Sequence, residues 1–289
     1  MKSISIFAVR AFLSTDPKHE FVFEGIKPEA GYLKRVSSII RADQIAEAVN
    51  AKLNPKQDYK NDVCIYIKPG LDKDGDLNFE SKSSYIDIID ELGYASVLKK
   101  HPELSAIVLS EQDYLTLAST GITNKIVLIP QHHCNFNREK RVRNKITTVG
   151  VIGHYKAFPY LPSELKSALA ERGMELLEFS EFFTRQDIID FYKKIDVQIV
   201  WRPYRKRLAN PLKIVNAASF GIPTIALDEI YFKEMGNCYI GVSDFDNFLT
   251  ELDKLRSSPT IYKAYSELCL KKAEEYHIEK IAQLYKNLN

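Results

Sequence analysis

The feature of this 289-residue sequence that most constrains its fold is an alternation of short β-branched runs with amphipathic stretches. Residues 63–67 (VCIYI) and 197–201 (VQIVW) are continuous apolar runs, typical of strands buried on both faces. Residues 33–53 instead carry apolar side chains at a helical period. Strands that alternate with helices predict an α/β fold, with parallel strands joined by crossover helices.

The alternation occurs in two series, separated by the polar, charged segment 136–145 (FNREKRVRNK). We therefore predict an N-terminal domain of residues 1–140 and a C-terminal domain of residues 141–289. The expected strands lie near residues 4–9, 63–67, 85–89, 105–110 and 125–130 in the first series, and near 146–152, 174–179, 197–201, 223–227 and 237–242 in the second. From residue 259 the chain is predicted to be helical to its end.

Composition excludes several functional classes. Forty Lys and Arg residues against 38 Asp and Glu leave a net charge of +2, which argues against a general nucleic-acid-binding surface. Neither GxGxxG nor GxxxxGK[ST] occurs, so ordinary dehydrogenases and P-loop ATPases are disfavoured. The four cysteines form no CxxC pair, and no apolar run approaches the roughly 18 residues that span a bilayer. These features favour a cytoplasmic protein.

The most informative stretch is residues 196–234, in which a strand, a loop and a helix follow one another. Arg202, Lys206 and Arg207 follow the strand, and Asn210 precedes a helix that has Lys213 in its first turn. Because parallel sheets bind ligands at the carboxyl ends of their strands, these cations are expected at a cleft between the domains. Cations beside a helix amino end can hold a diphosphate without a glycine-rich loop.

The next strand, 223–227, ends at the same predicted edge and is followed by Asp228 and Glu229. Their carboxylates can accept hydrogen bonds from the hydroxyls of a sugar or a ribose. We therefore predict that both residues contact the ligand.

In the order of its parts, this region resembles the donor-binding half of the GT-B glycosyltransferases, which use nucleotide sugars. The matching parts are the helix start NPLK, the small-residue helix AASFG, the strand GIPTIA and the acidic turn DEIYFKE. The loop GHYKAF matches that family's basic loop near the donor phosphates, which assigns Gly153, His154 and Lys156 to donor binding. Many retaining members carry two glutamates where this chain has Leu208 and Asn216, and Asn216 is the residue expected to contact donor hydroxyls.

The resemblance implies two Rossmann-like domains that face each other across a cleft, with the last helix crossing back. For the acceptor hydroxyl, His132 and His133 in PQHHC are candidate bases, because a neutral imidazole can take a proton. A pair of turn histidines is the alternative. Asp87 and Asp90 are further candidates, with helix capping as their alternative.

Three other motifs have simpler interpretations. DKDGD at residues 72–76 lacks the later ligands of a calcium loop, and a surface turn explains it better. Arg41 and Asp43 suit an ordinary helix-surface pair. The basic cluster 138–145 suits a solvated linker, with contact to an anionic membrane or to nucleic acid as the alternative.

The resemblance thus implies a glycosyltransferase that moves a sugar from a UDP-, GDP- or other nucleotide-sugar donor to the hydroxyl of a saccharide or lipid-linked acceptor, in glycan or polysaccharide biosynthesis. No metal and no permanently bound cofactor are expected. A nucleotide-sugar epimerase of the same fold and a non-catalytic nucleotide-binding module are the alternatives. Peripheral contact with the inner face of the membrane stays open.

Overall fold

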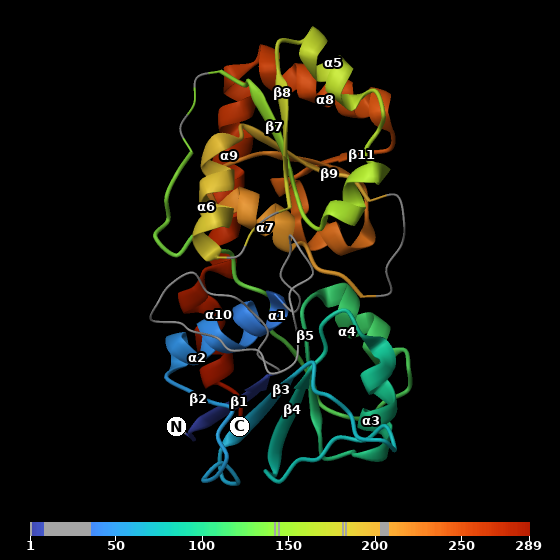
Figure 1. The fold of residues 1–289 in the computed structure, drawn as a ribbon, viewed down its shortest axis with the longest axis vertical. Helices are drawn as coiled ribbons and strands as arrows, with labels where there is room; N and C mark the ends of the chain where they lie inside the picture. The colour runs from blue at the N-terminus through green and yellow to red at the C-terminus, as the bar shows by residue number, and fades with distance from the viewer. Residues whose placement is uncertain are drawn as a thin grey trace.

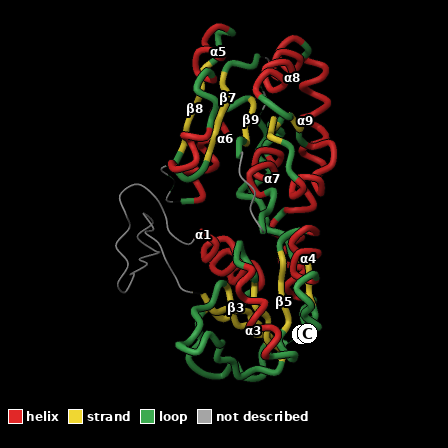
Figure 2. The backbone as a smooth tube through the Cα atoms, turned by 90° about the vertical axis from the view of Figure 1, so that its right-hand side faces the viewer, coloured by secondary structure: helices red, strands yellow, loops and turns green. Residues whose placement is uncertain are grey.

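The computed structural model describes residues 2–8, 36–141, 143, 145–180, 182, 184–202 and 208–289. Two sheets, both entirely parallel, form two lobes stacked along the long axis of the molecule (Figures 1 and 2). The predicted α/β class is therefore confirmed. The strands of one sheet end before residue 129 and those of the other begin at residue 148, and we keep 140/141 as the proposed domain boundary.

The N-terminal sheet has the strand order β2-β1-β3-β4-β5-β6. Its strands are β1 (Ile4–Ala8), β2 (Lys52–Leu53), β3 (Val63–Ile67), β4 (Ser83–Asp87), β5 (Ser105–Val108) and β6 (Ile126–Leu128). The helical segments are α1 (Val36–Ser38), the π-helical η2 (Ile39–Asp43), α2 (Gln44–Val49), the 3-10 segment η3 (Leu92–Tyr94), α3 (Ala95–Lys100) and α4 (Glu111–Ala118).

The C-terminal sheet has the order β11-β10-β9-β7-β8. Its strands are β7 (Thr148–Ile152), β8 (Glu175–Phe179), β9 (Val197–Val200), β10 (Thr224–Leu227) and β11 (Ile240–Val242). The helices are α5 (Leu165–Glu171), α6 (Arg185–Lys194), α7 (Leu212–Ser219), α8 (Phe245–Ser257), α9 (Pro259–Ala273) and α10 (Ile278–Lys286), with 3-10 segments η4 (Tyr155–Tyr160), η5 (Ile230–Cys238) and η6 (Glu274–Tyr276).

Strand β3 shows why its sequence is apolar throughout. Val63, Ile65 and Ile67 point into a core shared with α2 and α10, whereas Cys64 and Tyr66 point into a second core under α3 and α4. Successive side chains of a strand face opposite sides of the sheet. A strand with helices on both faces must therefore be apolar at every position.

The C-terminal end of the chain returns to the N-terminal lobe, as predicted. Helix α10 lies beside α2 in Figure 1, and its buried Ile281 and Tyr285 belong to the N-terminal core. From residue 259 to residue 286 the chain is helical, as predicted, except for a break at His277. His277 has an extended backbone and its side chain accepts a hydrogen bond from the N–H of Glu279, which starts α10 as a separate helix. No described helix is long and apolar enough to cross a bilayer.

Arg41 is fully buried, so its predicted place on a helix surface is wrong. Its Nε donates to Asp87 Oδ2 at 2.8 Å, and Nη1 donates to the carbonyl oxygens of Ile129 at 2.9 Å and Pro130 at 2.8 Å. The ring centroid of Tyr285 in α10 lies 5.3 Å from its guanidinium carbon. Arg41 thus joins a strand end, the start of the domain crossover and the returning helix. Asp87 is its buried partner and is neither exposed as a base nor a helix cap.

Substituting Arg41→Met should destabilise the protein by about 3–5 kcal/mol, because it leaves the carboxylate of Asp87 buried without its partner. The double variant Arg41→Met/Asp87→Leu should recover most of this loss, since neither charge then needs compensation. Urea unfolding of both variants measures the free energies. A single variant as stable as the wild type would show that the pair does not anchor the lobe.

Candidate functional site

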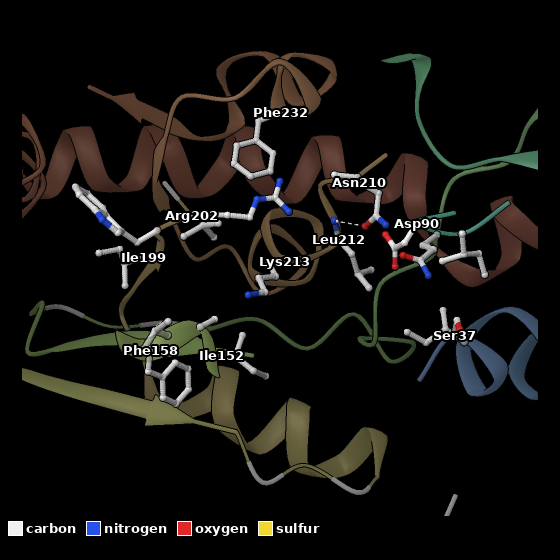
Figure 3. Close-up of a pocket in the computed structure, with 18 of the residues that line it drawn as sticks. Ser37, Asp90, Ile152, Phe158, Ile199, Arg202, Asn210, Leu212, Lys213 and Phe232 are labelled. Carbon is white, nitrogen blue, oxygen red and sulfur yellow. Dashed lines mark hydrogen bonds between the residues drawn. The ribbon is translucent and has the colours of Figure 1, made fainter. Parts of the chain in front are cut away.

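A cavity of about 430 Å³ lies between the two lobes, at the carboxyl ends of strands from both sheets (Figure 3). The N-terminal lobe contributes residues that follow β3, β4 and β6, together with α1 and η2. The C-terminal lobe contributes residues at the ends of β7 and β9 and the start of α7. This is the edge at which parallel sheets bind ligands.

The cavity has three sections (Figure 3). Phe158 and Ile199 lie at one end. Trp201 also lines the cavity and, like Phe158, packs against the hydrophobic cluster that contains Ile199. Arg202 and Lys213 lie in the middle. The N-terminal lobe closes the other end with polar groups, among them Asp90 and Ser37. An apolar, a cationic and a polar section therefore follow one another along a single cavity.

Lys213 is placed by two local features. Asn210 Oδ1 accepts a hydrogen bond from the N–H of Leu212 at 3.0 Å, where α7 begins, so that Lys213 falls in the first turn. Gly153, with φ +155°, follows β7, and a Cβ there would lie 2.7 Å from Lys213 Nζ. The backbone conformation therefore favours glycine, and a side chain there would displace the Lys213 ammonium group. Gly153, Asn210 and Lys213 lie together, and the last two line the cavity.

Arg202 is held by Glu229. Its Nε donates to Glu229 Oε1 at 3.0 Å, and its Nη2 pairs with Glu229 Oε2. The side chains are only 17% and 13% exposed, so the pair is shielded from solvent. Phe232 lies alongside, with its ring centroid 5.9 Å from the guanidinium carbon. Glu229 therefore orients Arg202, which lines the cavity. We predicted that Glu229 itself would contact the ligand, but it is not among the residues that line the cavity.

Several predicted residues lie elsewhere. Asp228 accepts a hydrogen bond from the Tyr239 hydroxyl at 2.8 Å, away from the cavity. Asn216 Oδ1 accepts from the N–H of Cys134 at 2.8 Å, so it ties α7 to the domain crossover. Residues at the carboxyl ends of parallel strands are expected at a ligand site, but this expectation, which we call the strand-end rule, does not take hydrogen bonds to other side chains and loops into account. Such hydrogen bonds set the directions of Asp228 and Asn216. Arg207 and Lys206 fall outside the described residues.

The loop after Gly153 also differs from its predicted arrangement. His154 Nδ1 accepts a hydrogen bond from the N–H of Lys156 at 3.2 Å, and its ring stacks on Tyr155 with centroids 4.7 Å apart. Neither His154 nor Lys156 lines the cavity, whereas Phe158 from the same 3-10 segment does. The loop contributes apolar surface to the cavity.

Neither His132 nor His133 lines the interlobe cavity, and both are buried with 2% exposure. The two ring nitrogens of His132 lie 3.1 Å and 3.0 Å from the carbonyl oxygens of His133 and Ile40. His133 Nδ1 accepts from the N–H of Asn135 at 3.2 Å. Burial lowers the pKa of His132 to about 4 and that of His133 to about 3. The expectation that these rings point into the cleft is corrected.

Asp90, one of the two alternative bases, does line the cavity, together with Lys68, which the sequence analysis missed. Lys68 Nζ lies 3.7 Å from Asp90 Oδ2. Both residues have positive φ, 43° and 61°, which is uncommon for residues other than glycine. Such strain tends to occur at functional sites. The position of Lys68 directly after a buried strand was the signal that could have identified it.

The two lobes are joined beside the cavity. Asp113 Oδ1 accepts from the N–H of Ala209 at 3.1 Å, and Ser110 Oγ donates to the carbonyl of Ala209 at 3.2 Å. Leu208 is buried in the core of the N-terminal lobe. Burial raises the pKa of Asp113 to about 7. Leu208 and Ala209 are therefore anchored on the opposite lobe.

No family model and no curated protein sequence matches the chain. Solved structures do. HepE of Anabaena, in complex with UDP and glucose, is similar at a TM-score of 0.62 and 10% identity, covering 99% of this chain and 98% of HepE. Sucrose-phosphate synthase of Thermosynechococcus elongatus matches at 0.59 and 13%, covering 100% and 99%. TarM matches at 0.58 and 14%, covering 80% of this chain.

These likenesses establish the GT-B fold for this chain, as the resemblance in sequence had implied. The chain spans only 55% of the length of TarM and 56% of the pneumococcal O-GlcNAc transferase GtfA. Among the described residues, no group of three or more His, Cys, Asp or Glu side chains is arranged to hold a metal ion.

Asp113→Asn should change how stability depends on pH. The pKa of Asp113 is about 7 in the folded protein and near 4 in the unfolded chain, so the folded protein holds this proton more tightly. The contribution of the proton to the free energy of unfolding is therefore complete below about pH 4 and is lost as the pH rises to 7. The asparagine variant should therefore gain stability relative to the wild type over this range, by at most about 1.4 kcal/mol per pH unit. Urea unfolding between pH 4 and 8 measures this difference, and a difference that is constant with pH would contradict the assignment.

Proposed function

We propose that this protein is a glycosyltransferase that moves a sugar from a nucleotide-sugar donor to an acceptor hydroxyl. The observation that carries the proposal is the order of sections along the interlobe cavity: apolar, cationic, then polar (Figure 3). A nucleotide sugar has the same order of parts, which are a flat base, a diphosphate and a hydroxyl-bearing sugar. The volume of about 430 Å³ lies within the range of small-molecule sites.

The donor would bind along the C-terminal lobe. Trp201 and Phe158 offer aromatic surface to the base, because flat rings stack favourably. Lys213 and Arg202 would hold the diphosphate, and the amino end of α7 adds the positive end of a helix dipole. UDP, GDP and other nucleotides share this diphosphate chemistry. The similar structures of HepE and GtfA were solved in complex with UDP and a sugar, which supports a nucleotide-sugar donor.

The transfer would form a bond between the sugar and the acceptor and break the bond between the sugar and the diphosphate. The acceptor oxygen attacks the anomeric carbon while the bond from that carbon to the diphosphate oxygen breaks. Lys213 and Arg202 then stabilise the negative charge that develops on the departing diphosphate. Because these cations occupy the diphosphate section, we propose a reaction that needs no metal ion and no permanently bound cofactor.

Asp90 is the residue we propose as the base that takes the proton of the acceptor hydroxyl. It projects from the N-terminal lobe, lines the cavity and remains 43% exposed, so an acceptor can reach it. Lys68 lies on one side of its carboxylate and can hold it in place. Asp90 replaces His132 and His133 in this role, because their rings are enclosed by protein.

The broader setting follows from the proposed chemistry. We propose a role in glycan or polysaccharide biosynthesis in the cytoplasm, with a saccharide or lipid-linked acceptor and with contact at the inner face of the membrane. An epimerase of the same fold would convert the donor without any acceptor. A non-catalytic module would bind nucleotide and consume no donor. Donor incubated alone, and then with candidate acceptors, separates these three functions.

Lys213→Ala should lower glycosyl transfer by about 100-fold or more, because the leaving diphosphate loses one of the two cations of the cationic section. The donor for this assay is first identified by a thermal-shift screen of nucleoside diphosphates and CMP, since ligands that bind the folded protein raise its melting temperature. Lys156→Ala removes a lysine that lies outside the cavity, and it should keep wild-type turnover. Equal turnover in both variants would reject the role of Lys213.

Asp90→Asn should reduce kcat by about 10²- to 10⁴-fold, because the amide cannot accept the acceptor proton. Donor binding, measured by calorimetry, should stay close to that of the wild type, since an amide in the same place can still form hydrogen bonds with the hydroxyls of the donor sugar. A parallel loss of donor affinity, with kcat unchanged, would show that Asp90 binds the donor and is not the base.

A further inference from the structure

A second large concavity lies at the opposite end of the C-terminal lobe from the interlobe cavity. It is a groove of about 970 Å³, lined before β7 at Ile146, before β8 at Gly173, at the end of α8 and at the start of α9. Because the interlobe cavity is at the carboxyl ends of the strands, this groove is at the amino ends. The proposed transfer reaction uses none of its residues.

The groove is strongly cationic. Seven lysine and arginine side chains line it against a single carboxylate, Glu267. The whole chain has a net charge of only +2, so this charge is concentrated in one place. The cations used in the argument below are Lys140, Arg141, Arg143, Lys145, Arg172 and Arg256.

The arginines are held in position by neighbouring groups. Arg141 Nη2 and Arg143 Nε lie 3.5 Å and 3.3 Å from Oδ1 of Asp196, which is fully buried. Since one carboxylate serves two guanidinium groups, a positive charge remains. Arg172 pairs with Asp253 at 3.1 Å, and its carbonyl accepts a hydrogen bond from Arg256 Nη1 at 2.8 Å. Fixed guanidinium groups suit the geometry of phosphate oxygens.

Two further features match an anionic ligand of limited size. The 15-residue helix α9 begins in the groove at Pro259, and helix amino ends favour anions. Tyr262 and Leu270 give the groove apolar surface beside its cations. The volume is near the upper end of small-molecule sites, and a concave site encloses a ligand instead of lying flat on a long duplex.

We propose that this groove is a second anion site that binds a phosphate-bearing ligand, either a soluble phosphate ester or the headgroup of an anionic lipid. Four of its cations, from Lys140 to Lys145, belong to the segment that crosses between the lobes. A ligand bound there contacts the connection between the lobes directly. The proposal is independent of the transfer reaction, since it concerns other residues at the far edge of the sheet.

The test uses the full chain and the double variant Lys140→Glu/Lys145→Glu, whose side chains are exposed and therefore tolerate substitution. Lys56→Glu/Lys99→Glu makes the same change of net charge on exposed positions of the N-terminal lobe and serves as the control. Calorimetry with inorganic pyrophosphate should show a site in the wild type and the control that weakens by at least about tenfold in the groove variant.

Pyrophosphate can also enter the interlobe cavity, so Lys213→Ala is measured in parallel. Lys213→Ala should still bind pyrophosphate in the groove with the affinity of the wild type. Its affinity for pyrophosphate in the interlobe cavity should be lower. Failure of the groove proposal and failure of the proposed function are thus separate results.

Flotation with vesicles identifies the source of the phosphate. If the wild type floats with vesicles of phosphatidylcholine and phosphatidylglycerol but not with phosphatidylcholine alone, and the groove variant does not, the ligand is a lipid headgroup. Pyrophosphate binding in the groove without flotation indicates a soluble ligand. The proposal is overturned if the groove variant matches the control in both measurements.

Discussion

The buried ion pair between Arg41 and Asp87 is the interaction on which the acceptor side of this molecule depends. Arg41 binds Asp87 and the carbonyl of Pro130, and each of these residues is followed closely in sequence by a residue that lines the interlobe cavity. These residues are Asp90, which follows Asp87, and Gln131, which follows Pro130. Ile40, which also lines the cavity, is adjacent to Arg41 itself. A buried charge is costly unless it is paired, so the arrangement has little freedom to change. The returning helix α10 packs against the same guanidinium, which connects the end of the chain to this wall.

The opposite wall is organised by shorter-range contacts. Glu229 holds Arg202, and the absence of a side chain at Gly153 leaves room for Lys213. Hydrogen bonds from the N-terminal lobe to Ala209 then keep the two walls together. Arg202 is therefore held in place before any ligand enters, which is the condition under which electrostatic stabilisation of a leaving group is most effective.

The course of the backbone could be predicted from the sequence, whereas the directions of several side chains could not. The period of apolar residues and the strand-end rule were sufficient for the parallel sheets, the cleft and the positions of Arg202 and Lys213. They could not predict the direction of His132 or Asn216, because tertiary burial and a partner distant in sequence decide where those side chains point. Arg41 was misread for the same reason: its partners lie 46 or more positions away.

A crystal structure of the protein with a nucleoside diphosphate tests the central claim most directly. We expect the diphosphate to lie between Lys213 and Arg202, with the base against Phe158 and Trp201. A nucleotide bound with its diphosphate outside the interlobe cavity, and with both cations still turned toward an unoccupied space, would contradict it.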